Sequence, residues 1–336
     1  MKKELAIEFG SENLRIFEKG VGIIFDEPNA VLCKNIDGIK TPASFCRKAA
    51  ENDGKLTENE EIIFPISCGK VIDSIAQKQI LQYALGKSGY DFNSYKKIKV
   101  LTCISCGSQA DDIEEFREII HSVGIKECYF VFQPICIAQT TNISPNQPQF
   151  IVDIGHGKTE IAIVLNNEIL KGIRLDIGGK MLNIGVKEIL KVDKNLLVSN
   201  IALEKIKVNI GSLYSTDTAS IKVWAQDLTT LITNMYSIYA KDINIAYIDC
   251  HNIIIDLIQS FLADLSPEMV AQITQNGIII SGGSSKLLGV KKYYENKLKM
   301  KIKLLNLGGA SVVEGSKFLG EFNSNSKSIF KYKSHG

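Results

Sequence analysis

The stretch FIVDIGHGKTEIAIV, residues 150–164, decides the fold of this 336-residue chain. Two apolar runs enclose a short polar turn, a pattern that predicts two antiparallel strands joined as a hairpin. One acid, Asp153, is embedded in the first run, two residues before the glycines of the turn. A buried carboxylate is costly unless a partner compensates its charge, so Asp153 marks a candidate ligand site.

The same pattern occurs near the N-terminus, in ELAIEFGSENLRIF at 4–17. There Glu8 takes the place of Asp153, again two residues before a glycine. A third glycine turn, in GIIISGGSSKLLGV at 277–290, follows an apolar strand and precedes a helical pattern. One copy of the hairpin in each half predicts a duplicated αβ domain with a cleft between the copies.

Glycine turns of this kind expose backbone N–H groups, which can hold phosphate oxygens. A carboxylate beside such a turn repels a phosphate unless a divalent cation or a water lies between them, and Mg²⁺ is the usual cation. We therefore expect Asp153 to hold metal-bound water and the turn at 155–157 to enclose a phosphate. Lys158 would add positive charge there, and Thr159 would donate its hydroxyl. The alternative is a plain hairpin with a solvated tip, but two matching turns and the GGSS segment favour a nucleotide.

Composition narrows the class of protein. The length favours two packed domains, and a formal net charge of +2 gives no global indication of nucleic-acid binding. The N-terminus MKKELAIEF lacks an apolar signal region, and no uninterrupted apolar run approaches about 20 residues. We expect the eight cysteines to be reduced thiols of a cytosolic protein. Cys103 and Cys106 form a CxxC pair, for which a redox or zinc role is the minor alternative.

Three segments show helical periodicity: 73–89, 108–125 and 242–265. The last carries Ile253, Leu257, Phe261 and Leu265 as its predicted buried face. Strands alternating with such helices predict an α/β fold. The C-terminal stretch EFNSNSKSIFKYKSHG at 321–336 is predicted to be a mobile, solvated tail, with a partner-binding anchor as the alternative.

Six motifs in order resemble those of the MreB-type bacterial actins, within the actin, chaperone and sugar-kinase superfamily. The resemblance runs from residue 4 to about residue 320. Its segments are AIEFGSEN with KGVGIIFDEPNAVL (6–32), FPISCGKVIDSIAQKQILQYAL (64–85), the stretch from KVLTCISCG to FQPICIA (99–138), FIVDIGHGKTEIAIV (150–164), IALEKIKVNIGSLY (201–214) and SPEMVAQITQNGIIISGGSSKLLGV (266–290).

The resemblance implies an actin-like α/β fold of duplicated RNase H-like domains in four subdomains, with ATP or ADP and Mg²⁺ in the central cleft. Domain I would cover 1–143 and 311–325, with a small insertion at about 31–70. Domain II would cover 144–310, with an insertion at about 180–243, and 326–336 would form a flexible tail. The family also implies self-association into filaments in the cytoplasm, at the inner face of the cell membrane or with membrane-protein partners, and no nucleic-acid partner.

The resemblance also implies roles for individual residues. Gln133 would orient the attacking water, and Glu8 and Asp153 would act in catalysis and hold Mg²⁺ through water. The nucleotide-binding residues would be Gly10, Ser11 and Asn13 in the first loop; Gly155, His156, Gly157, Lys158 and Thr159 in the second; Gly178 and Gly179; Glu204 and Lys207, three apart on one helical face; and Gly282, Gly283, Ser284 and Leu287. Without the resemblance, a surface ion pair explains Glu204 and Lys207 equally well.

The sequence departs from the family pattern at four positions. Glu8 replaces an aspartate, His156 and Lys158 replace glycine and threonine, and Lys180 replaces an aspartate. Displacements of about 1 Å at a reacting centre can cost about a hundredfold in rate. We therefore expect a divergent member, a filament protein with slow ATP hydrolysis.

Two other functions remain open: an actin-like adaptor that binds nucleotide with little or no hydrolysis, and a small-molecule kinase of the same superfamily. For membrane contact, GYDFNSYKKIKV at 89–100 combines Tyr90, Phe92 and Tyr95 with Lys96 and Lys97. This mixture suits an anionic interface, but a loop that covers a core explains it equally well.

Overall fold

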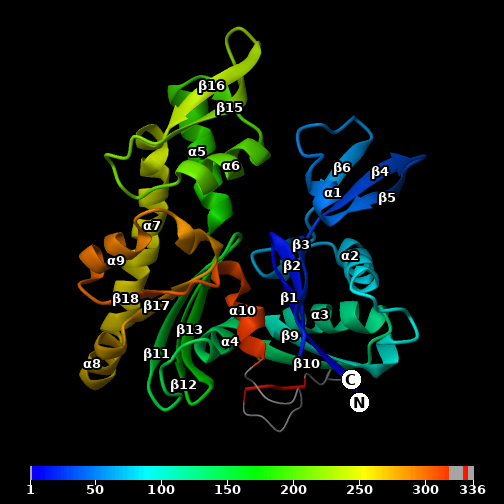
Figure 1. Ribbon diagram of the computed structural model, residues 1–336, viewed down its shortest axis with the longest axis vertical. Helices are drawn as coiled ribbons and strands as arrows, with labels where there is room; N and C mark the ends of the chain where they lie inside the picture. The colour runs from blue at the N-terminus through cyan, green and yellow to red at the C-terminus, as the bar shows by residue number, and fades with distance from the viewer. Residues whose placement is uncertain (1, 318–327, 332–336) are drawn as a thin grey trace.

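The computed structural model describes residues 2–317 and 328–331. Two lobes stand side by side, each built on a five-stranded sheet, and each carries a smaller sheet at its outer end (Figure 1). The fold is α/β, as the alternation of strands and helices predicts.

The sheet of the first lobe has the order β10-β9-β1-β2-β3. Its strands are β1 (Lys3–Phe9), β2 (Asn13–Glu18), β3 (Gly22–Pro28), β9 (Ile98–Ile104) and β10 (Glu127–Phe132). The first three run antiparallel as a meander, and β9 and β10 are parallel to β1. Side chains of β1 and β9 pack with those of α2 (Ser74–Lys87) and α3 (Ala110–Ser122) into one apolar core.

The sheet of the second lobe repeats this arrangement, with the order β13-β12-β11-β17-β18. Its strands are β11 (Gln149–Ile154), β12 (Thr159–Leu165), β13 (Glu168–Leu175), β17 (Ile278–Ser281) and β18 (Ile302–Leu304). Again a three-stranded meander is extended by two parallel strands. The predicted duplication is confirmed, and both predicted hairpins, β1–β2 and β11–β12, occupy equivalent places.

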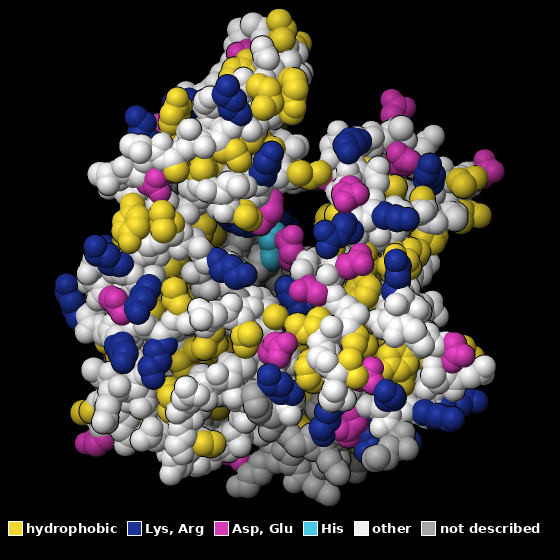
Figure 2. All heavy atoms as spheres, in the orientation of Figure 1, with side chains coloured by type: hydrophobic (Ala, Val, Ile, Leu, Met, Phe, Trp, Pro, Cys, Tyr) yellow, Lys and Arg dark blue, Asp and Glu magenta, His cyan; other side chains and the backbone are white. Residues whose placement is uncertain are grey.

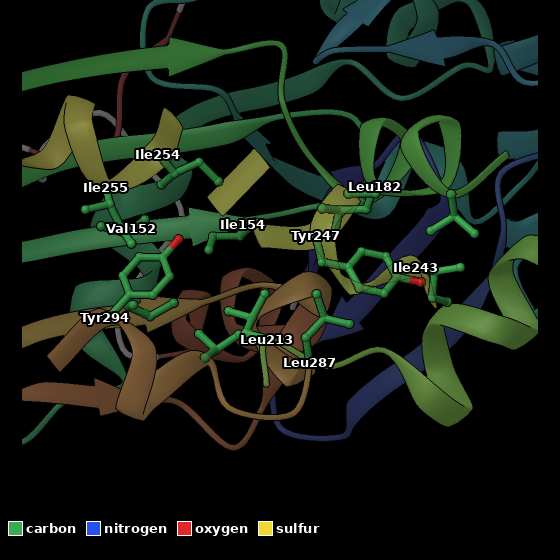
Figure 3. Packing of buried hydrophobic residues seen from close by; sticks show 14 of the residues in the cluster. Val152, Ile154, Leu182, Leu213, Ile243, Tyr247, Ile254, Ile255, Leu287 and Tyr294 are labelled. Atoms are coloured by element: carbon green, nitrogen blue, oxygen red, sulfur yellow. The ribbon is translucent and has the colours of Figure 1, made fainter. Parts of the chain in front are cut away.

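The core of the second lobe lies between its sheet and the helices α5 (Gly179–Asp193), α7 (Ala240–Ala263), α8 (Pro267–Asn276) and α9 (Val290–Leu298). Figure 3 shows Tyr247 and Tyr294 among branched aliphatic side chains of this core. Within the described part of the chain, α7 is the one helix long and apolar enough to span a membrane by length and composition. Because Ile243, Tyr247 and Ile258 of α7 are buried in the lobe, its apolarity is explained by core packing.

The three predicted helices are present, with ends that differ from the predicted ones by up to three residues. The predicted buried face of the last helix is wrong in part. Ile253 is 47% exposed, while Ile254 and Ile258 are buried. The run of three isoleucines at 253–255 allows more than one helical stripe, and only packing against the sheet selects among them.

The smaller sheets extend the two lobes. The first contains β4 (Val31–Ile36), β5 (Ile39–Phe45) and β6 (Glu60–Ile63), beside α1 (Cys46–Ala50). The second contains β14 (Leu196–Leu197), β15 (Ser220–Asp227) and β16 (Thr233–Tyr239), beside α6 (Asn200–Ile210). A two-stranded ribbon, β7 (Ile66–Ser67) and β8 (Lys70–Val71), leads into α2.

The lobes are joined at their base by α4 (Gln133–Gln139) and α10 (Ser311–Ser316), which pack against each other. Their side chains share one apolar cluster with both large sheets, including Leu101 of β9 and Ile151 of β11. One continuous core therefore links the lobes below the cleft.

The prediction of a solvated tail is wrong for the part that the structure describes. Phe330 exchanges two backbone hydrogen bonds with Phe130 at the outer strand β10, and Ile329 is buried. The segment covers a sheet edge that would otherwise present unpaired backbone groups. The rest of the stretch predicted as a solvated tail, 321–327 and 332–336, lies outside the described residues.

All eight cysteines are free thiols, six of them buried, in agreement with the prediction of reduced thiols. Burial raises the pKa of Cys106 to about 12, with the Glu160 carboxylate adding to the effect. Such a thiol is a poor nucleophile and a poor metal ligand at neutral pH.

Candidate functional site

The two hairpin loops meet at the mouth of the cleft. A methyl group added to Gly157 would lie 2.6 Å from Oγ of Ser11, so the loops touch without room for a side chain. The turn after β17 approaches just as closely, because Gly282 has a φ of +89° and its backbone lies against that of Ile154. The three glycine turns of the sequence therefore converge on one place.

They enclose a cavity of about 490 Å³, within the range of small-molecule sites. Figure 2 shows a hollow between the lobes, with acidic and histidine side chains at its edge. The predicted residues that line the cavity are Glu8, Gly10, Ser11, Asn13, Gln133, Asp153, Gly155, His156, Gly157, Lys158, Glu204, Lys207, Gly282, Gly283, Ser284 and Leu287.

Three predicted residues lie behind this lining. Thr159 is fully buried, and its hydroxyl donates to the carbonyl of Ile177 at 2.7 Å. The N–H of Gly179 donates to the carbonyl of Gly155 at 2.9 Å, next to Gly178. These residues shape the second loop from behind and do not face the cavity directly.

The acid of the first hairpin has a basic partner. Glu8 lies opposite Arg15 in the β1–β2 register, and Nη1 of Arg15 donates to Oε2 of Glu8 at 3.3 Å. Nε of Arg15 also lies 3.1 Å from Oδ1 of Asp26 on β3. Burial raises the pKa of Glu8 above its ordinary value, although Arg15 opposes the shift.

The acid of the second hairpin has an acidic neighbour instead. Asp153 lies opposite Glu160 in the β11–β12 register. Burial raises the pKa of Asp153 to about 7, and the charges of Glu160 and Glu8 add to the effect. At neutral pH, Asp153 is therefore stabilised either by protonation or, when it is ionised, by a cation bound in the cavity.

This donor set suits Mg²⁺. The ion prefers oxygen ligands and keeps several waters, so it is bound through one or two carboxylates together with phosphates. Glu8 and Asp153 supply the carboxylates, and the undercompensated charge at Asp153 provides the need for a cation. Among the described residues there is no cluster of three or more metal-ligating side chains, so a cage made of protein ligands alone is not indicated there.

Lys158 connects the second loop to Gln133. Its Nζ donates to Oε2 of Glu160 and to Oε1 of Gln133, both at 2.6 Å, and to Oγ of Ser105. An ammonium has three donors, so this arrangement leaves none for a phosphate oxygen. Lys158 therefore pairs with the fully buried carboxylate of Glu160 and does not donate to a phosphate as predicted.

The far end of the cavity is formed by α6. Nζ of Lys207 bonds Oε2 of Glu204 at 2.6 Å, and Nδ2 of Asn183 donates to the same carboxylate oxygen at 2.9 Å. Lys207 is only 8% exposed, so this is a half-buried pair in the cavity wall and not a free surface pair. Val208 and Leu287 add apolar surface beside it. Polar anchors beside apolar walls suit a sugar and a base.

Four charged residues of the site were not predicted from the sequence: Glu12, Arg15 and Lys286, which line the cavity, and Glu160, which lies opposite Asp153. Nδ1 of His156 lies 2.6 Å from Oε2 of Glu12, a side-chain contact across the lobes. Burial opposes ionisation of Glu12, but the hydrogen bond from His156 together with the surrounding positive charges outweighs it and lowers the pKa of Glu12. For Arg15 and Glu160 the signal was present, because hairpin register places them opposite Glu8 and Asp153.

Comparison with solved structures defines the class of protein first. The MreB5 structure of Spiroplasma citri with bound AMPPNP superposes with a TM-score of 0.90 at 20% identity, covering 95% of this chain and 96% of that one. A chain of the MamK double helical filament gives a TM-score of 0.78 at 17% identity, covering 94% and 98%. The fold is therefore actin-like, with two lobes around a central cleft.

The family follows from the sequence. The chain belongs to the MreB/Mbl protein family, whose model matches residues 2–328. The cell shape-determining protein MreB of Escherichia coli is 24% identical over 289 residues, covering 84% of this chain and 83% of that protein. The cell shape-determining protein Mbl of Bacillus subtilis is 23% identical over 304 residues, covering 89% and 90%. The predicted resemblance and fold are thus confirmed.

Proposed function

We propose that this protein is an ATP-dependent, filament-forming cytoskeletal protein with a role in cell shape, and that it hydrolyses ATP slowly. One observation carries the proposal: hairpin loops from two duplicated sheets meet at a single cavity that holds Glu8 and Asp153. Related structures support it, since MreB5 of Spiroplasma citri is described with bound AMPPNP and with bound ADP.

The residues divide the work along the cavity. Backbone N–H groups of the loops at 10–13 and 155–158 would hold the phosphates, and the Glu204–Lys207 end would hold ribose and base. Glu8 and Asp153 would hold Mg²⁺ through water, and the ion would neutralise charge on the phosphates. Gln133, 4% exposed in the cavity wall, would orient the attacking water, as an amide can without acting as a strong base.

Assembly would follow from the closed state of the cleft. A nucleotide that touches both loops fixes the angle between the lobes, and head-to-tail contact of identical molecules then propagates instead of closing. The relatives named MreB and Mbl are cell shape-determining proteins, and MamK forms a double helical filament. These names support self-association of this chain.

For location we propose the cytoplasm, at the inner face of the membrane or with membrane-protein partners. The 89–100 segment offers less for membrane contact than its sequence indicates, because Tyr95 is buried and Tyr90 donates to Glu18 at 2.7 Å. Phe92 remains 69% exposed near the exposed Lys96 and Lys97. Flotation with anionic vesicles, comparing the wild type with Phe92→Ser, tests this contact.

The domain boundaries are also a proposal. We keep domain I at 1–143 with 311–325 and domain II at 144–310, with the smaller sheets as insertions. The base helices α4 and α10 lie near these boundaries, and residues 318–325 fall outside the described part.

The test combines binding with assembly. Purified protein should bind ATP more tightly with Mg²⁺ than with EDTA, and electron microscopy should show filaments with MgATP. Monomers at every nucleotide and salt condition, together with measured ATP binding, would select the adaptor function instead. The bonding of Lys158 to Gln133 favours that second function, because it engages the residue proposed to orient water. Phosphate transfer to a sugar in place of hydrolysis would select the kinase.

A further inference from the structure

Gln133 is held at both ends of its amide. It begins α4 directly after β10 and lines the cavity. Its Nε2 donates to the carbonyl of Cys103 at 3.3 Å, and its Oε1 accepts from Nζ of Lys158 at 2.6 Å. The chemistry fixes this orientation of the amide, since an ammonium only donates and an amide NH₂ cannot accept.

Lys158 lines the cavity, but its ammonium is surrounded by the side chains of Gln133, Glu160 and Ser105, which we call the cage. Its other two donors go to Glu160 and Ser105, and the second oxygen of Glu160 accepts from the N–H of Cys106. Gly69 closes the cage from outside, because a methyl group there would lie 2.4 Å from Oγ of Ser105 and 3.4 Å from Cδ of Lys158. Glu160 is fully buried, so displacement of the ammonium would leave a buried carboxylate without a counter-charge, which is strongly unfavourable.

We propose that Lys158 is a positioning residue that restrains ATP hydrolysis by holding the amide oxygen of Gln133. The inference rests on the proposed function and deepens it. In the reaction, a water oxygen bonds to the terminal phosphorus as the bond to the bridging oxygen breaks, and the products are ADP, inorganic phosphate and a proton released to solvent. The water needs an acceptor, and Gln133 is the amide placed to provide one.

The restraint acts on the acceptor oxygen. A charge-assisted hydrogen bond is about twice as strong as a neutral one, so the ammonium is a strong competitor for this oxygen. The ammonium also draws electron density from the amide of Gln133. It keeps the amide oxygen pointing toward the ammonium, which Ser105 and Glu160 hold in place. Binding of nucleotide does not depend on this contact, because Lys158 has no donor left for the phosphates. The cage therefore separates binding from turnover.

The decisive variant is K158M/E160Q, which removes the buried ion pair as a unit and leaves no uncompensated charge. We expect phosphate release in a single turnover to rise about tenfold, less than the roughly 10²–10⁴-fold that a general base contributes, because an amide only orients the water. The dissociation constant for MgATP should change by less than about twofold, well below the tenfold change that corresponds to 1.4 kcal/mol. Lys171→Met is the matched control, because Lys171 pairs with Asp264 on the surface.

A background test separates positioning from mere stability. Gln133→Ala should lower the slow rate of the wild type only slightly, because Lys158 already holds the amide oxygen that would orient the water. In the K158M/E160Q background it should remove the gain. A purely structural role for Lys158 would change the melting temperature but would not make the effect of Gln133→Ala depend on the background.

K158T/E160Q serves as a second variant if K158M/E160Q does not fold, since threonine suits a strand start, its side chain ends short of Gln133, and Glu160 is again not left charged without a partner. It should raise the rate in the same direction. An unchanged or lower rate in the folded variants, with MgATP binding intact, overturns the inference alone. Absence of MgATP binding by the wild type overturns the proposed function itself, so the two failures are distinguishable.

Discussion

The two hairpins have the same strand pairing but differ in the residue that lies opposite the buried acid. In β1–β2, the residue opposite Glu8 is Arg15, which bonds it at 3.3 Å. In β11–β12, the residue opposite Asp153 is Glu160, whose own charge is taken by Lys158. Both acids line the cavity, but of the two only Glu8 has a basic residue as its cross-strand partner.

This difference assigns unequal roles to the two lobes. Duplicated sheets supply two phosphate-sized loops, and burial raises the pKa of both acids, but the cross-strand partner Glu160 adds to the shift at Asp153 whereas Arg15 opposes the shift at Glu8. We infer that the second lobe is the main binding site for Mg²⁺ and that Glu8 assists through water. The asymmetry lies entirely in cross-strand partners, which a comparison of loop glycines alone does not reveal.

The largest expected effect compares the two acids directly. Asp153→Asn should weaken MgATP binding about 100-fold, as loss of a group that orients metal or its water commonly does. Glu8→Gln should weaken it only about tenfold, because Arg15 already offsets part of the charge of Glu8. Isothermal titration calorimetry with Mg²⁺ and with EDTA measures both. Equal losses for the two variants would contradict the asymmetry.

The next effect concerns pH. The folded pKa of Asp153, about 7, lies above the ordinary value of about 3.9, so protonation favours the fold. That stabilisation is complete below about pH 4 and disappears as the pH rises through 7. At about 1.4 kcal/mol per pKa unit, metal-free protein should lose about 2–3 kcal/mol between pH 5 and pH 8 through this group.

Urea denaturation in EDTA at pH 5 and pH 8 measures the loss. Asp153→Asn should flatten the pH dependence, while the surface variant Asp264→Asn should leave it unchanged. If Asp153→Asn keeps the full pH dependence, another group causes it.

A smaller effect is expected from the counter-charge of the first hairpin. Arg15→Met leaves Glu8 and Asp26 without their shared partner. We expect a loss of about 1.5 kcal/mol in the free energy of unfolding, less than for a fully buried pair because Arg15 retains some exposure. R15M/E8Q should recover part of the loss in the same denaturation assay. Arg47→Met, an exposed position, is the control, and an equal loss there would remove the explanation.

The smallest effect concerns the contact between the loops. Gly157→Ala places a methyl group 2.6 Å from Oγ of Ser11, so the loops must separate. We expect ATP binding to weaken about tenfold, less than the hundredfold that a displacement of about 1 Å can cost at a reacting centre. S11G/G157A should restore affinity by removing the obstacle. Gly86→Ala, with open space around it, is the control. A loss that S11G/G157A does not reverse would indicate a different cause.

Local patterns predicted the duplicated sheets and the glycine turns, while the resemblance to the family supplied most of the other residues of the cavity lining. A period of two, interrupted by glycines, fixes a hairpin and the position of an acid within it. The resemblance supplied Gln133, which lines the cavity in the structure.

What it missed depends on distant partners. The bonding of Lys158 to Gln133 joins segments 25 residues apart, and the pair of Glu12 with His156 joins the two lobes. The docking of Phe330 on Phe130 and the buried face of α7 were likewise set by tertiary packing. Thr159 was expected at a phosphate, but its hydroxyl is used by the carbonyl of Ile177.

The apolar cluster around α4 and α10 has a consequence for how the molecule comes apart. Leu101 and Ile151 belong to different lobes, yet they are buried in the same cluster. If the chain were cut near residue 144, each fragment would expose the apolar surface of this cluster to solvent, so we expect neither fragment to fold alone. We therefore expect the lobes to move relative to each other at the open end of the cleft, while the apolar cluster at its base unfolds as one cooperative unit.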